Sequence, residues 1–87
     1  MTHNRVTMDH LLSLIVKEDY HVFPGTTLTV CVLTLKNGFT VTGEAACVDP
    51  ANFNEEIGQK YSREAAIEKM WPLEGYLLQQ RMYEETK

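Results

Sequence analysis

The stretch from Thr27 to Cys47, TLTVCVLTLKNGFTVTGEAAC, places an Asn-Gly pair between two runs rich in threonine and aliphatic residues. Asn-Gly in this setting is a strong short-range signal for a β-hairpin, because both residues tolerate the left-handed backbone that tight turns require. The sequence therefore predicts two antiparallel strands that reverse direction about Lys36, Asn37 and Gly38.

Two registers are compatible with this turn. In a two-residue turn at Asn37 and Gly38, Lys36 faces Phe39. In a three-residue loop, Lys36 and Asn37 form a type I turn, Gly38 takes the left-handed bulge position, and Leu35 faces Phe39. We prefer the second register because side chains alternate with a period of two, which gathers apolar residues on one face. That face would carry Cys31, Leu33, Leu35, Phe39, Val41, Ala45 and Cys47.

The opposite face of the hairpin is half apolar, and we expect another part of the protein to cover some of it. It would carry Leu28, Val30, Val32, Thr34, Thr40, Thr42 and Glu44. A two-stranded ribbon is marginally stable alone and needs further elements against it. Its open edges also favour pairing with a second copy. We therefore expect a homodimer, formed through the hairpin or through the last helix.

An N-terminal helix is predicted before the hairpin. Thr7 is suited to be its N-cap, Asp9 lies in its first turn, and an apolar set from Leu11 to Val16 follows. We expect this helix to end near Asp19 and to lie on a face of the hairpin.

Helices are also predicted after the hairpin. Asp49 can cap a short turn that begins at Pro50, and Asn54 can cap a longer helix that runs to about Met70. Pro72 should break or kink that helix, and a further helix would then run through Met82. The predicted fold is α+β in a single domain, residues 1–87, with an ordered core from about 7 to 83.

The face that the longer helix turns to the core is open to two interpretations. One stripe combines large apolar groups with two carboxylates that would need partners if buried: Ile57, Tyr61, Glu64, Glu68 and Trp71. The alternative centres the core face on Ile57, Gly58, Tyr61 and Ala65, and lets the glutamates pair with Lys60 at the rim.

Length and charge exclude several classes of function. A chain of 87 residues buries only roughly 60–65% of its unfolded surface, which leaves little room for a deep pocket beside a complete core. The net charge is −4, and the basic residues are scattered, so a nucleic-acid surface is not expected. No apolar run approaches the length of a membrane span, and we expect a cytoplasmic protein.

The residues that usually carry catalysis or bind metals do not form a recognisable pattern. His3, His10 and His21 lack the spacing of zinc ligands. Cys31 and Cys47 face each other in neither hairpin register, so we interpret both as reduced core residues. We expect no metal, no cofactor and no enzymatic activity.

Four motifs in a fixed order resemble a family of small tailed-phage and prophage proteins known from coliphage N-four and Shigella phage Sf-six. They are NGF at 37–39, GEAACVDPANF at 43–53, EIG at 56–58 and WPLEGY at 71–76. The likeness extends from about Val22 to Leu78. It implies a phage-encoded, non-virion accessory protein that acts in the cytoplasm of the infected cell, and it provides no catalytic residue.

Two groups of residues are candidates for contact with a partner or ligand. The first lies at and after the end of the second strand, and comprises Glu44, Asp49, Asn52, Asn54, Glu55 and Glu56. Helix capping by Asp49 and Asn54 is the structural alternative for this group. The second group comprises Lys60, Tyr61 and Arg63, which would meet the phosphate and base of a small nucleotide.

These observations lead to three hypotheses for function. The first is a non-enzymatic protein that binds and blocks a host protein, such as a defence or nucleic-acid-processing factor. The second is sequestration of a small nucleotide signal at a subunit interface. The third is a structural or regulatory subunit of a phage complex.

Overall fold

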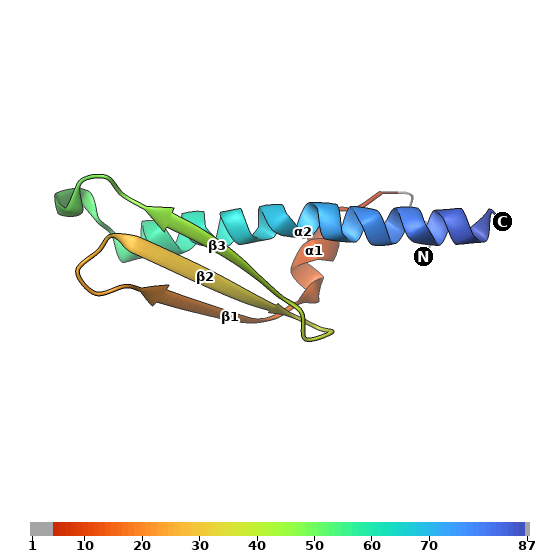
Figure 1. The fold of residues 1–87 in the computed structure, drawn as a ribbon, viewed down its shortest axis with the longest axis horizontal. Coiled ribbons are helices and arrows are strands. Elements are labelled where there is room, and N and C mark those ends of the chain that lie inside the picture. Colours follow the sequence, from red (N-terminus) through yellow and green to blue (C-terminus); the bar gives the residue numbers. More distant parts are fainter. Residues whose placement is uncertain (1–4, 87) are drawn as a thin grey trace.

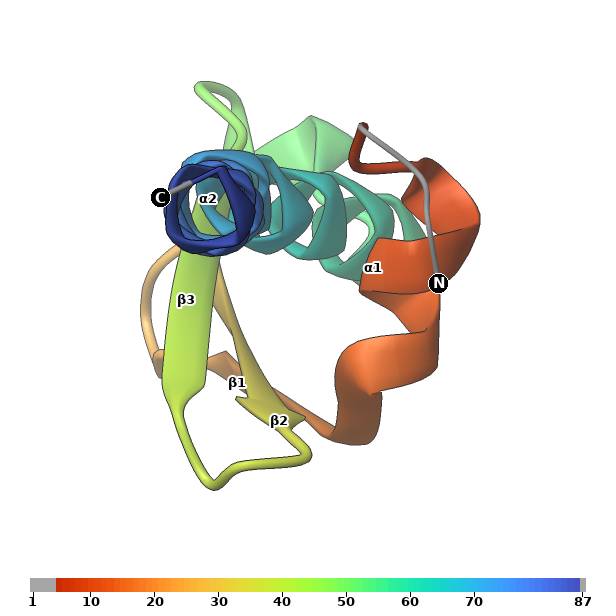
Figure 2. The same ribbon diagram turned by 90° about the vertical axis from the view of Figure 1, so that its right-hand side faces the viewer.

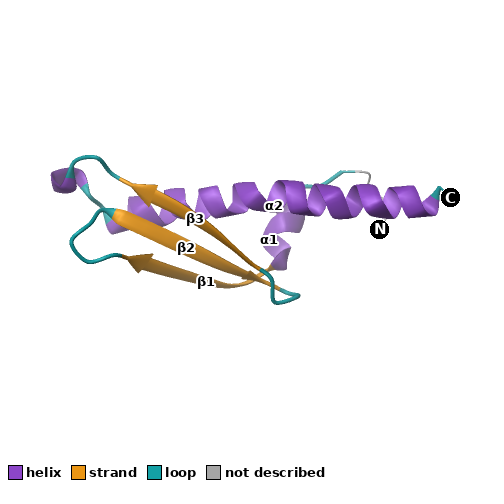
Figure 3. Cartoon of the chain, in the orientation of Figure 1, coloured by secondary structure: helices purple, strands orange, loops and turns teal. Residues whose placement is uncertain are grey.

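The computed structural model describes residues 5–86, and its α+β class confirms the prediction (Figure 1). The elements in chain order are α1 (Met8–Leu14), β1 (Ile15–Val22), β2 (Leu28–Leu35), β3 (Thr40–Ala46), a 3-10 turn η1 (Pro50–Asn52) and α2 (Glu55–Glu85). The three strands form an antiparallel sheet in the order β1-β2-β3. Figure 3 shows α2 running along one side of this sheet and continuing beyond it. His3, one of the three histidines considered above, lies outside the described residues.

The hairpin between β2 and β3 has the three-residue loop that the sequence favoured. The Leu35 amide donates to the Phe39 carbonyl at 2.8 Å, and the Gly38 amide donates to the Leu35 carbonyl at 2.9 Å. Gly38 has φ of 89°, a conformation that glycine adopts without steric cost. Leu35 therefore faces Phe39, and the predicted register is confirmed.

The prediction for the N-terminal helix was correct at its start and wrong at its end. The Thr7 side chain accepts from the His10 amide as the N-cap, and Asp9 lies in the first turn. The helix ends at Leu14, however, and Ile15–Val22 forms a strand that pairs with β2. The segment contains Ile15, Val16 and Val22, and β-branched residues have a low helix propensity and a high strand propensity. The β2 strand also offers a free edge with which this segment can pair.

The two helices predicted around Pro72 are one continuous helix of 31 residues, α2. A proline inside a helix has no N–H to donate to the carbonyl four residues earlier, here that of Glu68. Glu68 and Pro72 are both exposed, so water can satisfy this carbonyl. Met70, which lies between these two residues, is fully buried and anchors this turn to the core. Packing of α2 therefore overrides the break that the local sequence favours.

The hydrophobic core lies between the sheet and the two helices, which are on the same side of the sheet (Figure 2). Its buried residues are Leu11, Cys31, Leu33, Leu35, Val41, Ala66, Ile67 and Met70. Both interpretations of the α2 core face were wrong. Ile57 and Tyr61 are 51% and 54% exposed, and Glu64 and Glu68 point to solvent. The buried face of α2 is instead Ser62, Ala66, Ile67 and Met70.

Small residues decide which face of α2 meets the sheet. A Cβ added to Gly43 of β3 would collide with the backbone of α2 at the Ser62 carbonyl and the Ala66 amide. Strand and helix backbones are therefore in direct contact at Gly43. Only small side chains fit beside such a contact, which explains why Ser62 and Ala66 lie there while the larger Tyr61 faces outward.

The second face of the sheet, which we name the outer face, is not covered by any described element. Its cross-strand rows are His21–Val30–Glu44, Asp19–Val32–Thr42 and Lys17–Thr34–Thr40, with Leu28 beside Ala46. The expectation that part of this face is covered is thus not met within residues 5–86.

We predict that Gly43→Ala destabilises the fold by about 1–3 kcal/mol, because the added methyl group must push α2 away from β3. Chemical denaturation monitored by circular dichroism would measure this change. The neighbouring substitution Thr42→Ala, on the exposed outer face, should cost less than about 1 kcal/mol. Equal effects of the two substitutions would contradict the close approach.

Candidate functional site

The polar segment after β3 caps two helical elements. Asp49 accepts from the Ala51 amide at 3.0 Å, and the Asn52 side-chain amide lies 3.5 Å from its second carboxylate oxygen. Asn54 accepts from the amides of Glu56 and Ile57 at 2.9 and 3.3 Å. The capping interpretation of Asp49 and Asn54 is therefore confirmed, although both side chains remain exposed.

The other acidic candidates remain available for contacts. Glu55 and Glu56 lie exposed in the first turn of α2, where the positive end of the helix stabilises carboxylates. Glu44 is exposed on the outer face, where it pairs across the strands with Val30. The structure thus distributes the first candidate group over one end of the molecule and the adjoining outer face, rather than around a single point.

Arg63 does not face an open anion site. Its Nε and Nη2 donate to the two carboxylate oxygens of Glu18 at 3.1 and 3.2 Å. Arginine and carboxylate match in this two-pronged geometry, which fixes both side chains. Arg63 therefore links α2 to β1, and a nucleotide phosphate would have to compete with Glu18 for it.

Tyr20 extends the Glu18–Arg63 pair into a small network. Its hydroxyl donates to Glu18 Oε1 at 2.9 Å. The hydrogen bonds from Arg63 hold the pKa of Glu18 below its usual value, against a smaller opposing effect of burial. Burial, together with the hydrogen bond to Glu18, raises the pKa of Tyr20, so the hydroxyl remains a donor.

Lys60 and Tyr61 make a separate contact on the exposed side of α2. The Lys60 ammonium lies 5.7 Å from the centroid of the Tyr61 ring, within the range of a cation–π interaction. Arg63 points toward β1 instead. The residues proposed for nucleotide binding are thus only partly brought together within one chain.

The two cysteines are free, in agreement with the prediction that they do not pair. Cys31 is buried beneath α2, and burial raises its pKa, which keeps the thiol protonated and poorly nucleophilic. The Cys47 thiol donates to the Asp49 carbonyl at 2.8 Å, so it contributes to the turn after β3. Neither cysteine is arranged as a nucleophile.

Two properties of residues 5–86 bear on the class of site. They contain no group of three or more His, Cys, Asp or Glu side chains that could hold a metal ion. None of their helices is both long and apolar enough to cross a membrane. The outer face, with valines in the central strand and polar residues on either side, is a functional candidate that no described element covers.

Comparison with known proteins gives the context of this surface. Residues 6–82 match the model of the phage protein family described as N4 Gp49/phage Sf6 gene 66. The chain belongs to this phage protein family. The match confirms the resemblance drawn from the sequence motifs, and it includes all three strands and α2 as far as Met82. No curated protein and no solved structure matches the chain.

The phage-family segment also includes the Glu18–Arg63 pair, which sequence reasoning missed. The two residues are 45 positions apart, and the hydrophobic pattern does not connect them. Recognising Ile15–Val22 as a strand would have placed Glu18 on the same face as Tyr20 and thus toward α2. Without that strand, no signal pointed to the contact.

We predict that the Glu18–Arg63 pair contributes about 0.5–1 kcal/mol, because both side chains are about one third exposed and solvent weakens the attraction. A double-mutant cycle with Glu18→Gln and Arg63→Met would measure it. A coupling energy near zero would contradict the proposed role of the pair.

The same pair should respond to acid in a defined direction. The pKa of Glu18 is lowered in the folded state from an ordinary value of 4.5, so the stabilisation is present above that pH and is lost as the pH falls below it. The difference in stability between the wild type and Arg63→Met should accordingly shrink in acid, as denaturation at neutral pH and at about pH 3 would show.

Proposed function

We propose that this phage protein is a non-enzymatic accessory protein that binds a host protein through its outer face. The observation that carries the proposal is the apolar centre of that face, which no described element covers. A protein interface commonly has such an arrangement, with an apolar centre and a polar rim. Here Val30 and Val32 form the centre, and the rim is contributed by β1 and β3.

The size of the outer face indicates that the contact extends beyond the strands. Three strands of seven or eight residues span roughly 14 Å by 25 Å, or about 350 Å². A stable interface takes about 800 Å² from each partner. The surface that adjoins the end of β3 can supply part of the remainder, since Val48 is fully exposed there and Glu55 and Glu56 lie nearby at the start of α2 (Figure 1).

The charges around this surface suggest the chemistry of the partner. Glu44, Asp49, Glu55 and Glu56 give the rim and the adjoining end an acidic character. An acidic rim favours a partner whose apolar patch is bordered by Lys or Arg, because opposite charges steer association and select against acidic surfaces. Host proteins that handle nucleic acid commonly carry basic surfaces of this kind.

The state of the candidate nucleophiles supports the non-enzymatic class. Cys31 is buried with a raised pKa, and the Cys47 thiol is engaged by the Asp49 carbonyl. Asp49 and Asn54 are engaged as caps. The exposed polar groups are thus better suited to recognition than to covalent chemistry.

We predict that Val32→Lys reduces capture of the host partner at least about tenfold, because a cation replaces the apolar centre of the contact. Pull-down from host lysate with the purified protein, quantified for the dominant captured protein, would measure this. Tyr61→Gln is the matched control, since it removes an exposed apolar group from α2 on the other side of the sheet and should leave capture unchanged. A melting temperature close to that of the wild type would show that the variant is folded. Capture that is unaffected by Val32→Lys would exclude the outer face.

We further predict that charge reversal by Glu55→Lys and Glu56→Lys together weakens capture of the host partner. The difference in capture from the wild type should diminish as salt rises from about 50 to 500 mM, because salt screens exposed charges. Glu84→Lys with Glu85→Lys changes the net charge equally at the other end of α2 and serves as the control. Equal losses in both double variants would indicate a general charge effect rather than a local contact.

The nucleotide hypothesis has a separate test. A ligand that binds the folded state raises its melting temperature by mass action, so a panel of cyclic nucleotides would reveal a nucleotide binder. We expect no shift, because Arg63 is engaged by Glu18. A clear shift that is lost in Lys60→Ala would replace our proposal with the nucleotide alternative.

A further inference from the structure

The C-terminal part of α2, Trp71 to Glu85, projects past the end of the sheet (Figure 1). We name this segment the arm. It is about 22 Å long at 1.5 Å per residue. Several large apolar side chains along it are exposed by 37% to 69%: Leu73, Tyr76, Leu77, Met82 and Tyr83. Trp71, at the start of the arm, packs against the core, whereas these five side chains remain exposed in the part of the chain that the structure describes.

Gly75 is the second unusual feature of the arm. The other glycines have reasons within the chain: Gly25 and Gly38 have positive φ, and a Cβ at Gly43 or Gly58 would collide with a neighbour. A Cβ at Gly75 would meet nothing within 4 Å, and its helical backbone does not require glycine. Glycine inside a helix is unfavourable relative to alanine. No contact among residues 5–86 therefore accounts for a glycine at this position.

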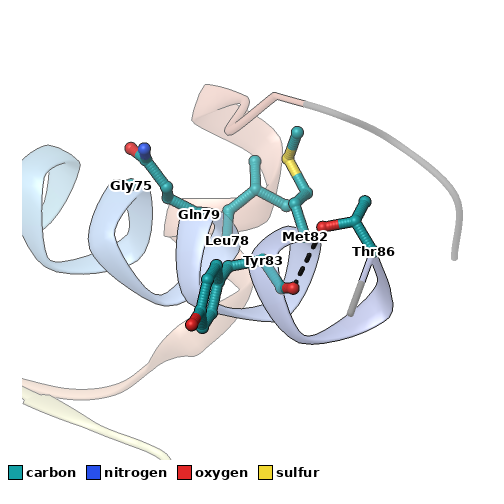
Figure 4. A pocket seen from close by; sticks show the side chains of 6 residues that line it. All are labelled: Gly75, Leu78, Gln79, Met82, Tyr83 and Thr86. Carbon is teal, nitrogen blue, oxygen red and sulfur yellow. Dashed lines mark hydrogen bonds between the residues drawn. The ribbon is translucent and has the colours of Figure 1, made fainter.

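Gly75 lies in a stripe that has the spacing of a helix–helix interface. Trp71, Gly75, Leu78 and Met82 are separated by four, three and four residues, the pattern of positions that face a partner helix. An open groove of about 460 Å³ lies along the C-terminal part of this stripe, from Gly75 onward (Figure 4). It is lined by Gly75, Leu78, Gln79, Met82, Tyr83 and Thr86.

We propose that the arm binds the arm of a second copy of this chain in an antiparallel pair, with Leu78 of each copy seated against Gly75 of the other. In this register Trp71 meets the partner's Met82, and each such contact occurs twice. A parallel pair in register would instead place Gly75 opposite the partner's Gly75, which leaves a void that packed interfaces do not tolerate.

The charges beside the stripe favour the same orientation. Glu74 and Arg81 are seven residues apart and therefore lie on the same flank of the helix. The antiparallel pair brings Glu74 next to the partner's Arg81 at both ends of the contact, whereas a parallel pair places these two flanks on opposite sides and forms no such ion pair. The Glu74 side chain is only 13% exposed and its Oε1 lies 3.0 Å from His10 Nε2, so the other carboxylate oxygen is the one that a second donor would have to reach.

A second copy suits the arm better than an unrelated helix because the stripe carries both complementary residues, the small Gly75 and the large Leu78. The small residue and the large residue that fills the space beside it, Gly75 and Leu78, are three positions apart, so two-fold symmetry brings them together twice. This inference is independent of the proposed host contact, since the arm and the outer face are separate surfaces.

Sedimentation velocity of the full chain over about 1–100 µM tests the pair. We expect a dimer in the wild type, and Leu78→Gln and Met82→Gln should each raise its Kd at least about tenfold, since each removes apolar burial twice. Tyr76→Gln, on another face of the arm, is the matched control and should leave the Kd unchanged. A wild type that is monomeric at 100 µM, or dimers unaffected by both substitutions, would overturn the proposal.

Gly75→Leu separates dimerisation from folding. Leucine has a higher helix propensity than glycine, and a Cβ at this position meets nothing within 4 Å, so helix content by circular dichroism should be retained. The same side chain fills the space that the partner's Leu78 needs, so the dimer should be lost. A dimer as stable as that of the wild type would refute the close approach at Gly75.

Disulfide cross-linking tests the orientation. In a Cys47→Ser background, a mixture of Gly75→Cys and Leu78→Cys chains should cross-link on oxidation, because these positions oppose each other only in the antiparallel pair. Leu78→Cys chains alone should remain uncross-linked. Rapid cross-linking of Leu78→Cys chains alone, without cross-linking in the mixture, would show a parallel pair and contradict the proposed register.

Discussion

The direct contact between the backbones of β3 and α2 at Gly43 determines most of the fold. Because no side chain separates them there, α2 can lie close enough for Ala66, Ile67 and Met70 to reach the core. The same contact requires small residues on the helix and turns its larger residues outward. The face that α2 presents to solvent, including Tyr61, therefore follows from a glycine in another element. An 87-residue chain with few core residues depends strongly on such a contact.

The Glu18–Arg63 pair complements that contact at the other edge of the sheet. Gly43 holds β3 to α2, and Arg63 holds β1 to the same helix. Both edges of the sheet are thus fixed on the helix side, and the outer face has no comparable partner within residues 5–86. The residues of the outer face, from Lys17 to Glu44, therefore lie on a sheet whose position is fixed by contacts with α2 on its opposite face. A surface supported in this way needs little rearrangement to bind, which lowers the entropic cost of association.

The sequence predicted those features that depend on neighbours in the chain. The register about Gly38, the capping by Thr7, Asp49 and Asn54, and the separation of the cysteines all follow from turn chemistry and periodicity. The features it missed depend on distant contacts. Ile15–Val22 becomes a strand because β2 offers an edge, and α2 passes Pro72 because Met70 and the core support it. Of the candidate site, the capping roles of Asp49 and Asn54 followed from the local sequence, whereas the engagement of Arg63 by Glu18 required a strand that local propensity did not reveal.

Pro72 has a mechanical consequence for α2. The proline cannot donate to the Glu68 carbonyl, and this gap in the hydrogen-bond ladder lies where the helix leaves the sheet. Bending stiffness is reduced at that turn, while the turns on either side keep their own bonds. The helix can therefore bend more easily at this turn than elsewhere along its length, and the contact between His10 and Glu74 just beyond the proline limits how far it bends.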